Sequence, residues 1–436
     1  MVRGARQVGK TYTIREFGKK YFENIVEVNF DEIPQIKESF VSQDVNAIIF
    51  DLENFYETPI KPGRTLLFFD EIQACPKAIA SLRYFYEKHP GIHVIAAGSL
   101  LDHILNEFPY SMPVGRVEFA YMNPMSFNEF LLATGNKKSF ELIRNFIPGE
   151  EISPVIHRKI TGLLRNYISV GGMPEAVDVY IKSSGMREVA KVHESILRSF
   201  EYDFAKYGSA VQQRIMSRLL RYLPKTPGQK FKYVNFDPVL RSSQIKDALK
   251  LLELSRIVHI VSSTNAVSVP LETGVNEKVF KTTFLDIGLV SHILNPGPVD
   301  LNKIILNNEG GLAEQFVAQE IIAGAVPFTN KKLHYWTREK KNSSSEIDYL
   351  VSGGSSVMPI EVKAGKTGSL KSLHVFMAEK KMKTAIRFNA DQPSVTGVEG
   401  KVVFTGKPVT TKFQLISLPH YLAGETERIV AQNNKI

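Results

Sequence analysis

The sequence predicts an α/β protein that contains more than one domain. The chain has 436 residues, and because domains average roughly 150 residues we expect two to four of them. Near the N-terminus, short apolar runs alternate with helical stretches, the pattern of a sheet covered by helices. The pattern becomes helical from Pro154 and alternates again from Asn302. These changes divide the chain into an α/β part, a helical part and a second α/β part.

The composition excludes several classes of protein. Hydrophobic residues make up 43% and charged residues 23% of the chain, which is ordinary for a globular protein and too apolar for a disordered one. The single cysteine, Cys75, rules out internal disulfides and cysteine zinc sites, so we expect a reducing compartment. No apolar run approaches the roughly 18 residues of a membrane span, and no signal-peptide pattern is present. The sequence therefore predicts a cytoplasmic protein without membrane contact.

Three apolar runs in the first part of the chain predict strands, at 25–30, 65–69 and 93–97. A helix is expected between the last two, over 81–88. The runs at 65–69 and 93–97 lack polar alternation, as expected for strands that are buried on both faces of a sheet. These runs predict a parallel sheet.

The segment before the first predicted helix, GARQVGKT, satisfies the pattern GxxxxGK[ST] in full. In this pattern the backbone N–H groups surround a phosphate, the lysine reaches the β- and γ-phosphates, and the hydroxyl ligates Mg²⁺. The sequence therefore predicts a site for ATP and Mg²⁺ made of Gly4, Ala5, Arg6, Gln7, Val8, Gly9, Lys10 and Thr11. Only three residues precede Gly4, so we expect the first strand of this sheet to be truncated.

Two carboxylates follow the buried run at 65–69, at the strand end where open α/β sheets place their ligands. We expect Asp70 to hold Mg²⁺ together with Thr11. Glu71 is the predicted catalytic carboxylate that polarises the attacking water.

Two further residues have predicted catalytic roles. Ser99 follows the next predicted strand and would contact the γ-phosphate or the attacking water; the alternative is an N-cap for the helix that follows. Arg116 would neutralise the charge that develops in the transition state, within one chain or across a subunit interface. The alternative for Arg116 is an exposed structural arginine.

Positive charge is concentrated in the middle of the chain. Between Lys206 and Lys250, ten Lys or Arg side chains stand against Asp237 and Asp247, a net charge of +8. Such an excess indicates a surface that faces phosphate backbones or another polyanion, and the alternative is a solvated helical face. A helix near 245–252 precedes strand-like runs at 257–261 and 279–285. Helices followed by a β-hairpin are typical of a winged helix-turn-helix.

A third set of charged residues lies in the last part of the chain. Glu314 is on a predicted helix, and Asp348, Glu361 and Lys363 are on predicted strands. Strand alternation places Glu361 and Lys363 on the same face. The three carboxylates could hold Mg²⁺ against a scissile phosphate, and Lys363 would be the catalytic group that orients or deprotonates water. The alternative is a cross-strand ion pair.

These motifs have a family resemblance. GARQVGKT, LLFFDEIQ, VIAAGSLL, YISVGGMPEAV and PIEVKAGKTGSLKSL resemble the prokaryotic AAA-type ATPases that are fused to a C-terminal domain of unknown function. The order E…D…ExK is similar to the active site of restriction-endonuclease-like, PD-(D/E)xK, nucleases. The resemblance implies ATP binding and hydrolysis. It also implies a P-loop NTPase core at 1–135, a helical lid at 136–205, a winged helix-turn-helix at 206–300 and a nuclease-like α/β domain at 301–436.

Three functional hypotheses follow. The first is a Mg²⁺-dependent ATPase whose nucleotide state controls how the C-terminal half engages DNA, a protein partner or further copies of the chain. The second is a Mg²⁺-dependent DNA nuclease in which ATP binding is regulatory. The third is a non-enzymatic interaction protein in which both sites are remnants.

Overall fold

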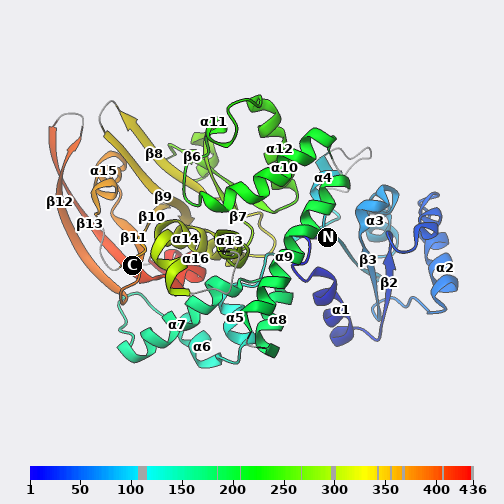
Figure 1. Cartoon of the computed structure of the whole chain (residues 1–436). Helices are drawn as coiled ribbons and strands as arrows, with labels where there is room; N and C mark the ends of the chain where they lie inside the picture. Colours follow the sequence, from blue (N-terminus) through cyan, green and yellow to red (C-terminus); the bar gives the residue numbers. More distant parts are fainter. Residues whose placement is uncertain are drawn as a thin grey trace. The chain divides into compact units, whose positions relative to one another are not determined.

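The chain folds into two compact units (Figure 1). The computed structural model describes residues 1–106, 115–183, 185–206, 208–266, 268–295, 301–340, 343–353, 356–365, 369–404 and 407–433. Unit 1 contains Met1–Asn123, Leu254–Ile257 and Val326–Asn330. Unit 2 contains Pro124–Glu253, Val258–Ala325 and Lys331–Ile436. Two short segments from the second half of the chain are therefore part of unit 1.

Unit 1 is built on a parallel sheet of five strands in the order β2-β3-β4-β1-β5. The strands are β1 (Val2–Arg3), β2 (Asn24–Asn29), β3 (Thr65–Asp70), β4 (His93–Gly98) and β5 (Ala120–Tyr121). The residues before Gly4 form the short β1, in which Val2 pairs with Ala97 on one side and Ala120 on the other. Although β1 is short, it lies between β4 and β5 and gives both strands backbone hydrogen-bond partners.

Helices cover both faces of this sheet. They are α1 (Lys10–Tyr21), α2 (Val45–Tyr56), α3 (Pro76–Lys88) and α4 (Leu101–Asn106), with short 3₁₀ helices η1 (Pro34–Phe40) and η2 (Ile72–Ala74). Leu66 and Phe68 of β3 pack with Ile14 of α1. Leu67 and Phe69 belong to the core formed with α2 and α3. Because both faces of β3 are covered, its apolar run is continuous, as the sequence predicts.

Unit 2 contains the remaining helices. They are α5 (Phe127–Ala133), α6 (Lys137–Asn145), α7 (Pro154–Val170), α8 (Pro174–Ser183), α9 (Met186–Asp203), α10 (Ala210–Tyr222), α11 (Tyr233–Phe236), α12 (Ser242–Leu254), α13 (Ile287–Leu294), α14 (Leu301–Ala323), α15 (Lys371–Lys380) and α16 (Thr426–Asn433). Short 3₁₀ helices are η3 (Phe204–Lys206), η4 (Leu223–Lys225), η5 (Leu271–Gly274) and η6 (His420–Glu425). Within the described part of the chain, no helix has both the length and the apolar character needed to cross a membrane.

Unit 2 is organised by a mixed sheet of eight strands in the order β12-β13-β11-β10-β9-β8-β6-β7. The strands are β6 (Val258–Thr264), β7 (Val275–Phe284), β8 (His334–Lys340), β9 (Ser343–Gly353), β10 (Ser356–Val362), β11 (Thr384–Asn389), β12 (Ser394–Phe404) and β13 (Lys407–Pro419). The hairpin of β12 and β13, orange to red in Figure 1, forms one edge of this sheet and was not predicted.

The hairpin of β6 and β7 differs from the predicted wing. Ser262 and Ser263 of β6 pair in parallel with His334 and Tyr335 of β8, so the hairpin extends the C-terminal sheet. The expected boundary between 300 and 301 therefore divides one sheet and one compact unit. Pairing with β8 gives partners to backbone groups of β6 that a free-standing wing would leave as an edge.

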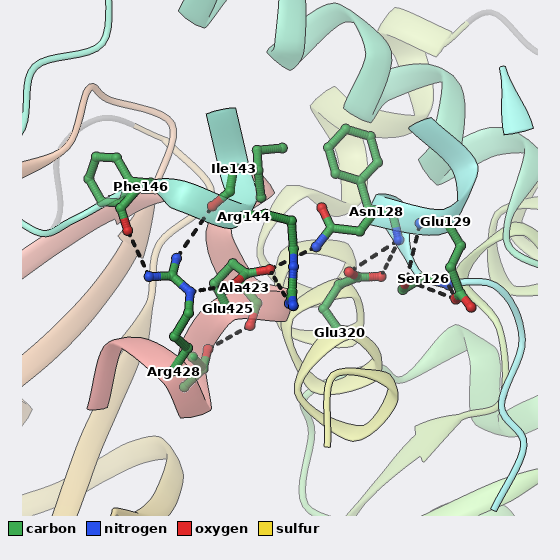
Figure 2. Close-up of polar contacts among 12 residues, drawn as sticks. Ser126, Asn128, Glu129, Ile143, Arg144, Phe146, Glu320, Ala423, Glu425 and Arg428 are labelled. Atoms are coloured by element: carbon green, nitrogen blue, oxygen red, sulfur yellow. Dashed lines mark hydrogen bonds and ion pairs between the residues drawn. The ribbon is translucent and has the colours of Figure 1, made fainter. Parts of the chain in front are cut away.

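The segment predicted as a lid is joined to the C-terminal end of the chain (Figure 2). Glu425 of η6, whose side chain is fully buried, accepts hydrogen bonds from Asn128 Nδ2 at 2.9 Å and Arg144 Nη1 at 3.1 Å. Its other oxygen accepts one from Arg428 Nε at 2.6 Å. Arg428 also donates to the carbonyl of Phe146 at 2.9 Å. One buried carboxylate thus links α5, α6 and α16.

Replacing Glu425 with glutamine should lower the free energy of unfolding by about 1.5–3 kcal/mol, because two guanidinium groups lose their charged acceptor. Urea denaturation followed by circular dichroism measures this loss. The exposed Glu151 provides the matched control, and Glu151→Gln should unfold like the parent. Equal midpoints for Glu425→Gln and Glu151→Gln would contradict the assigned role.

Candidate functional site

The loop between β1 and α1 has the conformation of a phosphate-binding loop. Gly9 (φ 94°) and Gln7 (φ 64°) lie in the left-handed region, which turns the backbone sharply. A Cβ on Gly4 would lie 2.4 Å from the carbonyl oxygen of Met122, so a side chain does not fit there. Gly9 provides no side-chain cap for α1, and the first turn of that helix has no acidic residue. The N–H groups at the start of a helix suit an anion.

Lys10 lies folded over this loop. Its side chain is buried, and Nζ donates hydrogen bonds to the carbonyl oxygens of Gly4 at 3.0 Å and Ala5 at 2.7 Å. Burial lowers the pKa of Lys10 to about 8; Glu71 and Asp70 oppose this shift, and Arg6 and Arg256 add to it. The ammonium is therefore held beside the loop by weak neutral acceptors that a phosphate can replace.

Thr11 and Asp70 lie in direct contact. Thr11 Oγ1, at the start of α1, donates a hydrogen bond to Asp70 Oδ2 at 2.9 Å. Asp70 ends the buried strand β3, and burial raises the pKa of its carboxyl group. A hydroxyl and a carboxylate at this separation are oxygen ligands that suit Mg²⁺. The geometry fits the predicted metal position.

Glu71 follows Asp70 with a left-handed backbone (φ 49°). Its Oε2 accepts a hydrogen bond from Nε2 of Gln73. The other amide atom, Gln73 Oε1, is buried and has no hydrogen-bond partner within the described residues. A Cβ on Gly98 would lie 1.8 Å from this oxygen, so the glycine at the end of β4 makes room for Gln73. Gln73 was not predicted, although it is part of the same LLFFDEIQ motif.

The two other predicted catalytic residues have different surroundings. Ser99 is half-buried and directly follows β4, which pairs with β3, the strand that ends in Asp70. Arg116 is partly exposed, and its Nε donates to Glu87 Oε1 on α3 at 3.1 Å. Ser99 is thus at the edge of the sheet where Asp70 lies, and Arg116 is bonded to a carboxylate of α3.

A cluster of charged residues in unit 1 was missed because no sequence pattern marks it. Arg256 donates to Asp102 Oδ2 at 2.6 Å, and its guanidinium lies 4.5 Å from the ring centroid of Tyr121. Arg3 pairs with the other oxygen of Asp102 at 3.0 Å. His103 and Ser255 are hydrogen-bonded at 2.9 Å. The segment that follows α12 is therefore attached to the start of α4.

Two of the predicted nuclease-like residues in unit 2, Glu314 and Asp348, contact a lysine that was not predicted. Lys281 of β7 has a side chain that is 2% exposed. Its Nζ lies 3.3 Å from Glu314 Oε2 and 3.9 Å from Asp348 Oδ1, and it also contacts Glu346. Lys363 Nζ donates to Glu361 Oε1 at 2.5 Å. Glu314, Glu346 and Asp348 thus gather around the ammonium group of Lys281, and Glu361 pairs with Lys363.

The electrostatics of this group differ from those of an open metal site. Burial raises the pKa of Glu314 to about 8 and that of Glu361 to about 7. Burial would lower the pKa of Lys281, but the carboxylates of Glu314, Asp348 and Glu346 hold it above its ordinary value. Among the described residues, no three acidic, histidine or cysteine side chains are grouped so that they could hold a metal ion. The metal role expected for Glu314, Asp348 and Glu361 does not fit this arrangement.

The basic segment at 206–250 is only partly neutralised. Arg218 pairs with Asp237 at 2.8 Å, and Arg221 pairs with Glu194 and Glu201. Lys206 and Lys230 also pair with carboxylates. Six of the ten cations are exposed and have no acidic partner among the described residues: Arg214, Lys225, Lys232, Arg241, Lys246 and Lys250. We refer to these six as the basic surface.

Comparisons with known proteins agree with the geometry of unit 1. Residues 1–131 match a family model described as an AAA domain. Unit 1 has the fold of a P-loop ATPase. Residues 161–300 and 309–406 match two domains of unknown function (DUF8612 and DUF4143).

Comparison with whole proteins adds little. None of the curated proteins compared with the chain matches it. Among solved structures, the Aeropyrum pernix ORC2 protein in its ADPNP–ADP complexes is 13% identical, with a TM-score of 0.31 over 70% of this chain and 87% of that one. A TM-score this low does not establish a shared fold.

Proposed function

We propose that the chain hydrolyses ATP in unit 1. The observation that supports this most directly is the 2.9 Å contact between Thr11 and Asp70, next to a lysine folded over the loop of residues 4–9. Main-chain N–H groups and Lys10 would bind the phosphates of ATP. Thr11 and Asp70 would hold Mg²⁺, which neutralises phosphate charge when it is bound.

Glu71 is the proposed base. Its carboxylate lies directly after Asp70, where it can accept a proton from the attacking water. Gln73 bonds one of its oxygens and so orients it. Ser99 is the proposed polar contact for the γ-phosphate or the water, since it follows the adjacent strand β4. Arg116 would bind developing phosphate charge only after leaving Glu87.

The test is a pair of threonine variants on the same helix. Thr11→Ala removes the hydroxyl that contacts Asp70, whereas Thr13 is exposed. We expect Thr11→Ala to abolish the Mg²⁺-dependent release of phosphate from ATP, and Thr13→Ala to retain it. Equal rates in the two variants, or no ATP binding by the parent, would refute the proposed ATPase.

The affinity for ATP should fall as the pH rises through about 8, the pKa of Lys10 in the free protein. Below that pH the ammonium is charged and available to the phosphates; above it, binding must take up a proton, and the loss approaches about tenfold per pH unit. Titration calorimetry in two buffers of different ionisation enthalpy measures the proton uptake. An affinity that is constant on both sides of this pH would show that Lys10 does not bind the phosphates in its ammonium form.

We further propose that unit 2 binds a polyanion such as DNA, and that nucleotide state affects this binding. The basic surface supports the first part, because its six cations have no acidic partners among the described residues. The second part is supported by Arg256, which follows α12 and is bonded to Asp102 in unit 1. Burial is the main cause of the lowered pKa of Lys10, and the positive charges of Arg6 and Arg256 lower it further.

Reversing two charges of the basic surface should weaken DNA binding. Lys246→Glu with Lys250→Glu is expected to lower the affinity for a labelled duplex and to reduce the slope of log K against log salt by about 0.9 for each lost phosphate contact. Fluorescence anisotropy at several salt concentrations measures both. Lys159→Glu, at an exposed position of α7, is the control. An unchanged slope in the double variant would remove the basic surface from the proposal.

A further inference from the structure

The carboxylates of Glu314, Glu346, Asp348 and Glu361 form one group, which we call the acidic cluster. Glu314 is on α14, Glu346 and Asp348 are on β9, and Glu361 is on β10. Three of the four converge on the Nζ atom of Lys281, which comes from β7. Residues far apart in sequence thus surround one ammonium group.

Lysines balance most of the charge of the acidic cluster. Lys281 contacts Glu314, Glu346 and Asp348, while Lys230 pairs with Glu346 at 3.3 Å and Lys363 with Glu361 at 2.5 Å. Glu361, with a pKa raised to about 7 by burial, holds a proton for part of the time near neutral pH. A divalent ion added to this arrangement would bring an excess of positive charge into a buried site.

Lys281 is also enclosed. Its Nζ lies 5.1 Å from the centroid of the Tyr335 ring. Gly228, in the loop between η4 and α11, covers Glu314: a Cβ at Gly228 would lie 2.5 Å from Glu314 Oε2. A metal ion could bind Glu314, Glu346 and Asp348 together only if the Lys281 ammonium moved away. The Lys281 side chain is 2% exposed, so no solvent lies beside it into which the ammonium could move.

We propose that the Lys281 ammonium is the resident cation of the acidic cluster and takes the place that a divalent metal ion has in metal-dependent nucleases. The cluster is then complete without a metal, and unit 2 does not cleave phosphodiester bonds by metal catalysis at this position. Removing the ammonium should let the three carboxylates that contact it, those of Glu314, Glu346 and Asp348, close around a divalent cation in its place.

The test measures Mn²⁺ uptake by the full chain, from the electron paramagnetic resonance signal of free Mn²⁺. All proteins have Asp70→Asn, which removes the carboxylate of the expected metal position in unit 1. Lys281→Met keeps the length of the side chain without its charge. Lys278→Met changes an exposed lysine of the same strand and is the matched control. Asp348→Asn, alone and combined with Lys281→Met, identifies binding that depends on the acidic cluster.

We expect the parent and Lys278→Met to show no uptake that depends on Asp348. Lys281→Met should bind Mn²⁺ at least about tenfold more tightly than the parent, and Asp348→Asn should reverse the gain. Uptake by the parent that disappears with Asp348→Asn would overturn the proposal, as would a folded Lys281→Met that gains no site. If Lys281→Met does not fold, the Mn²⁺ uptake of the parent is compared with that of Asp348→Asn alone. A lower uptake by Asp348→Asn refutes the proposal, because the acidic cluster then already binds a metal ion. Equal uptake by the two proteins supports the proposal.

Discussion

Glu71→Gln should bind ATP as tightly as the parent and hydrolyse it about 10²–10⁴-fold more slowly, the usual contribution of a positioned base. The substitution keeps the size of the side chain and the oxygen that Gln73 can bond, but removes the group that accepts a proton. Because Lys10, Thr11 and Asp70 are untouched, the phosphates and the metal should bind normally. Phosphate release gives the rate, and calorimetry with ATP gives the affinity.

Glu57→Gln is the control for this variant. Glu57 is exposed in unit 1 and has the same left-handed backbone (φ 48°) as Glu71, so any general cost of placing glutamine in that conformation appears in both. A Glu71→Gln protein that turns over ATP like Glu57→Gln would assign the base to another residue. Loss of ATP binding together with hydrolysis would show instead that Glu71 supports the structure of the loop.

Lys281→Met should lower the free energy of unfolding by about 3–5 kcal/mol near neutral pH, because it leaves buried carboxylates without their counter-charge. Lys281 contacts three of them and is almost fully enclosed. Urea denaturation at several pH values measures the loss, and Lys278→Met should unfold like the parent.

The loss should depend on pH in a defined direction. Burial raises the pKa of Glu314 from 4.5 to about 8 in the folded parent. A carboxyl group whose pKa is raised by folding stabilises the protein when it is protonated, and this contribution is lost as the pH rises between the unfolded and folded values. Removing Lys281 raises that pKa further. Below about pH 8 Glu314 is protonated in both folded proteins, so the deficit of Lys281→Met should grow as the pH rises above about 8, where the carboxyl group of the parent ionises and that of the variant does not. A deficit that shrinks above this pH would contradict the assigned contacts.

Most of unit 1 could be predicted from short stretches of the chain. The loop of residues 4–11, the run at 65–69 and the carboxylates that follow it are local patterns, and parallel strands bring their carboxyl ends to one edge of a sheet. Thr11 and Asp70 are consequently in contact as that topology requires. Gln73 lies in the same motif, but its contact with Gly98 depends on how β3 and β4 are paired.

Unit 2 was less predictable because its order depends on contacts between distant segments. The strands β6 and β7 were expected as a wing, yet β6 pairs with β8, about 70 residues later in the chain. Alternation of apolar and polar residues predicts a strand but not its neighbour. The ion pair between Glu425 and Arg144 of α6 likewise joins segments that are far apart in the chain.

Local sequence alone thus established a phosphate-binding loop, its acidic partner and the α/β character of the chain, since each follows from residues close together or from the period of a strand. The folded arrangement decided what the charged residues of the second half do. Lys281 lies in a plain strand and matches no motif, but β7 brings it among carboxylates from α14 and β9. Whether such carboxylates face a metal ion or an ammonium depends on the side chain that the fold places between them, because electrostatic energy depends on distance and burial rather than on position in the chain.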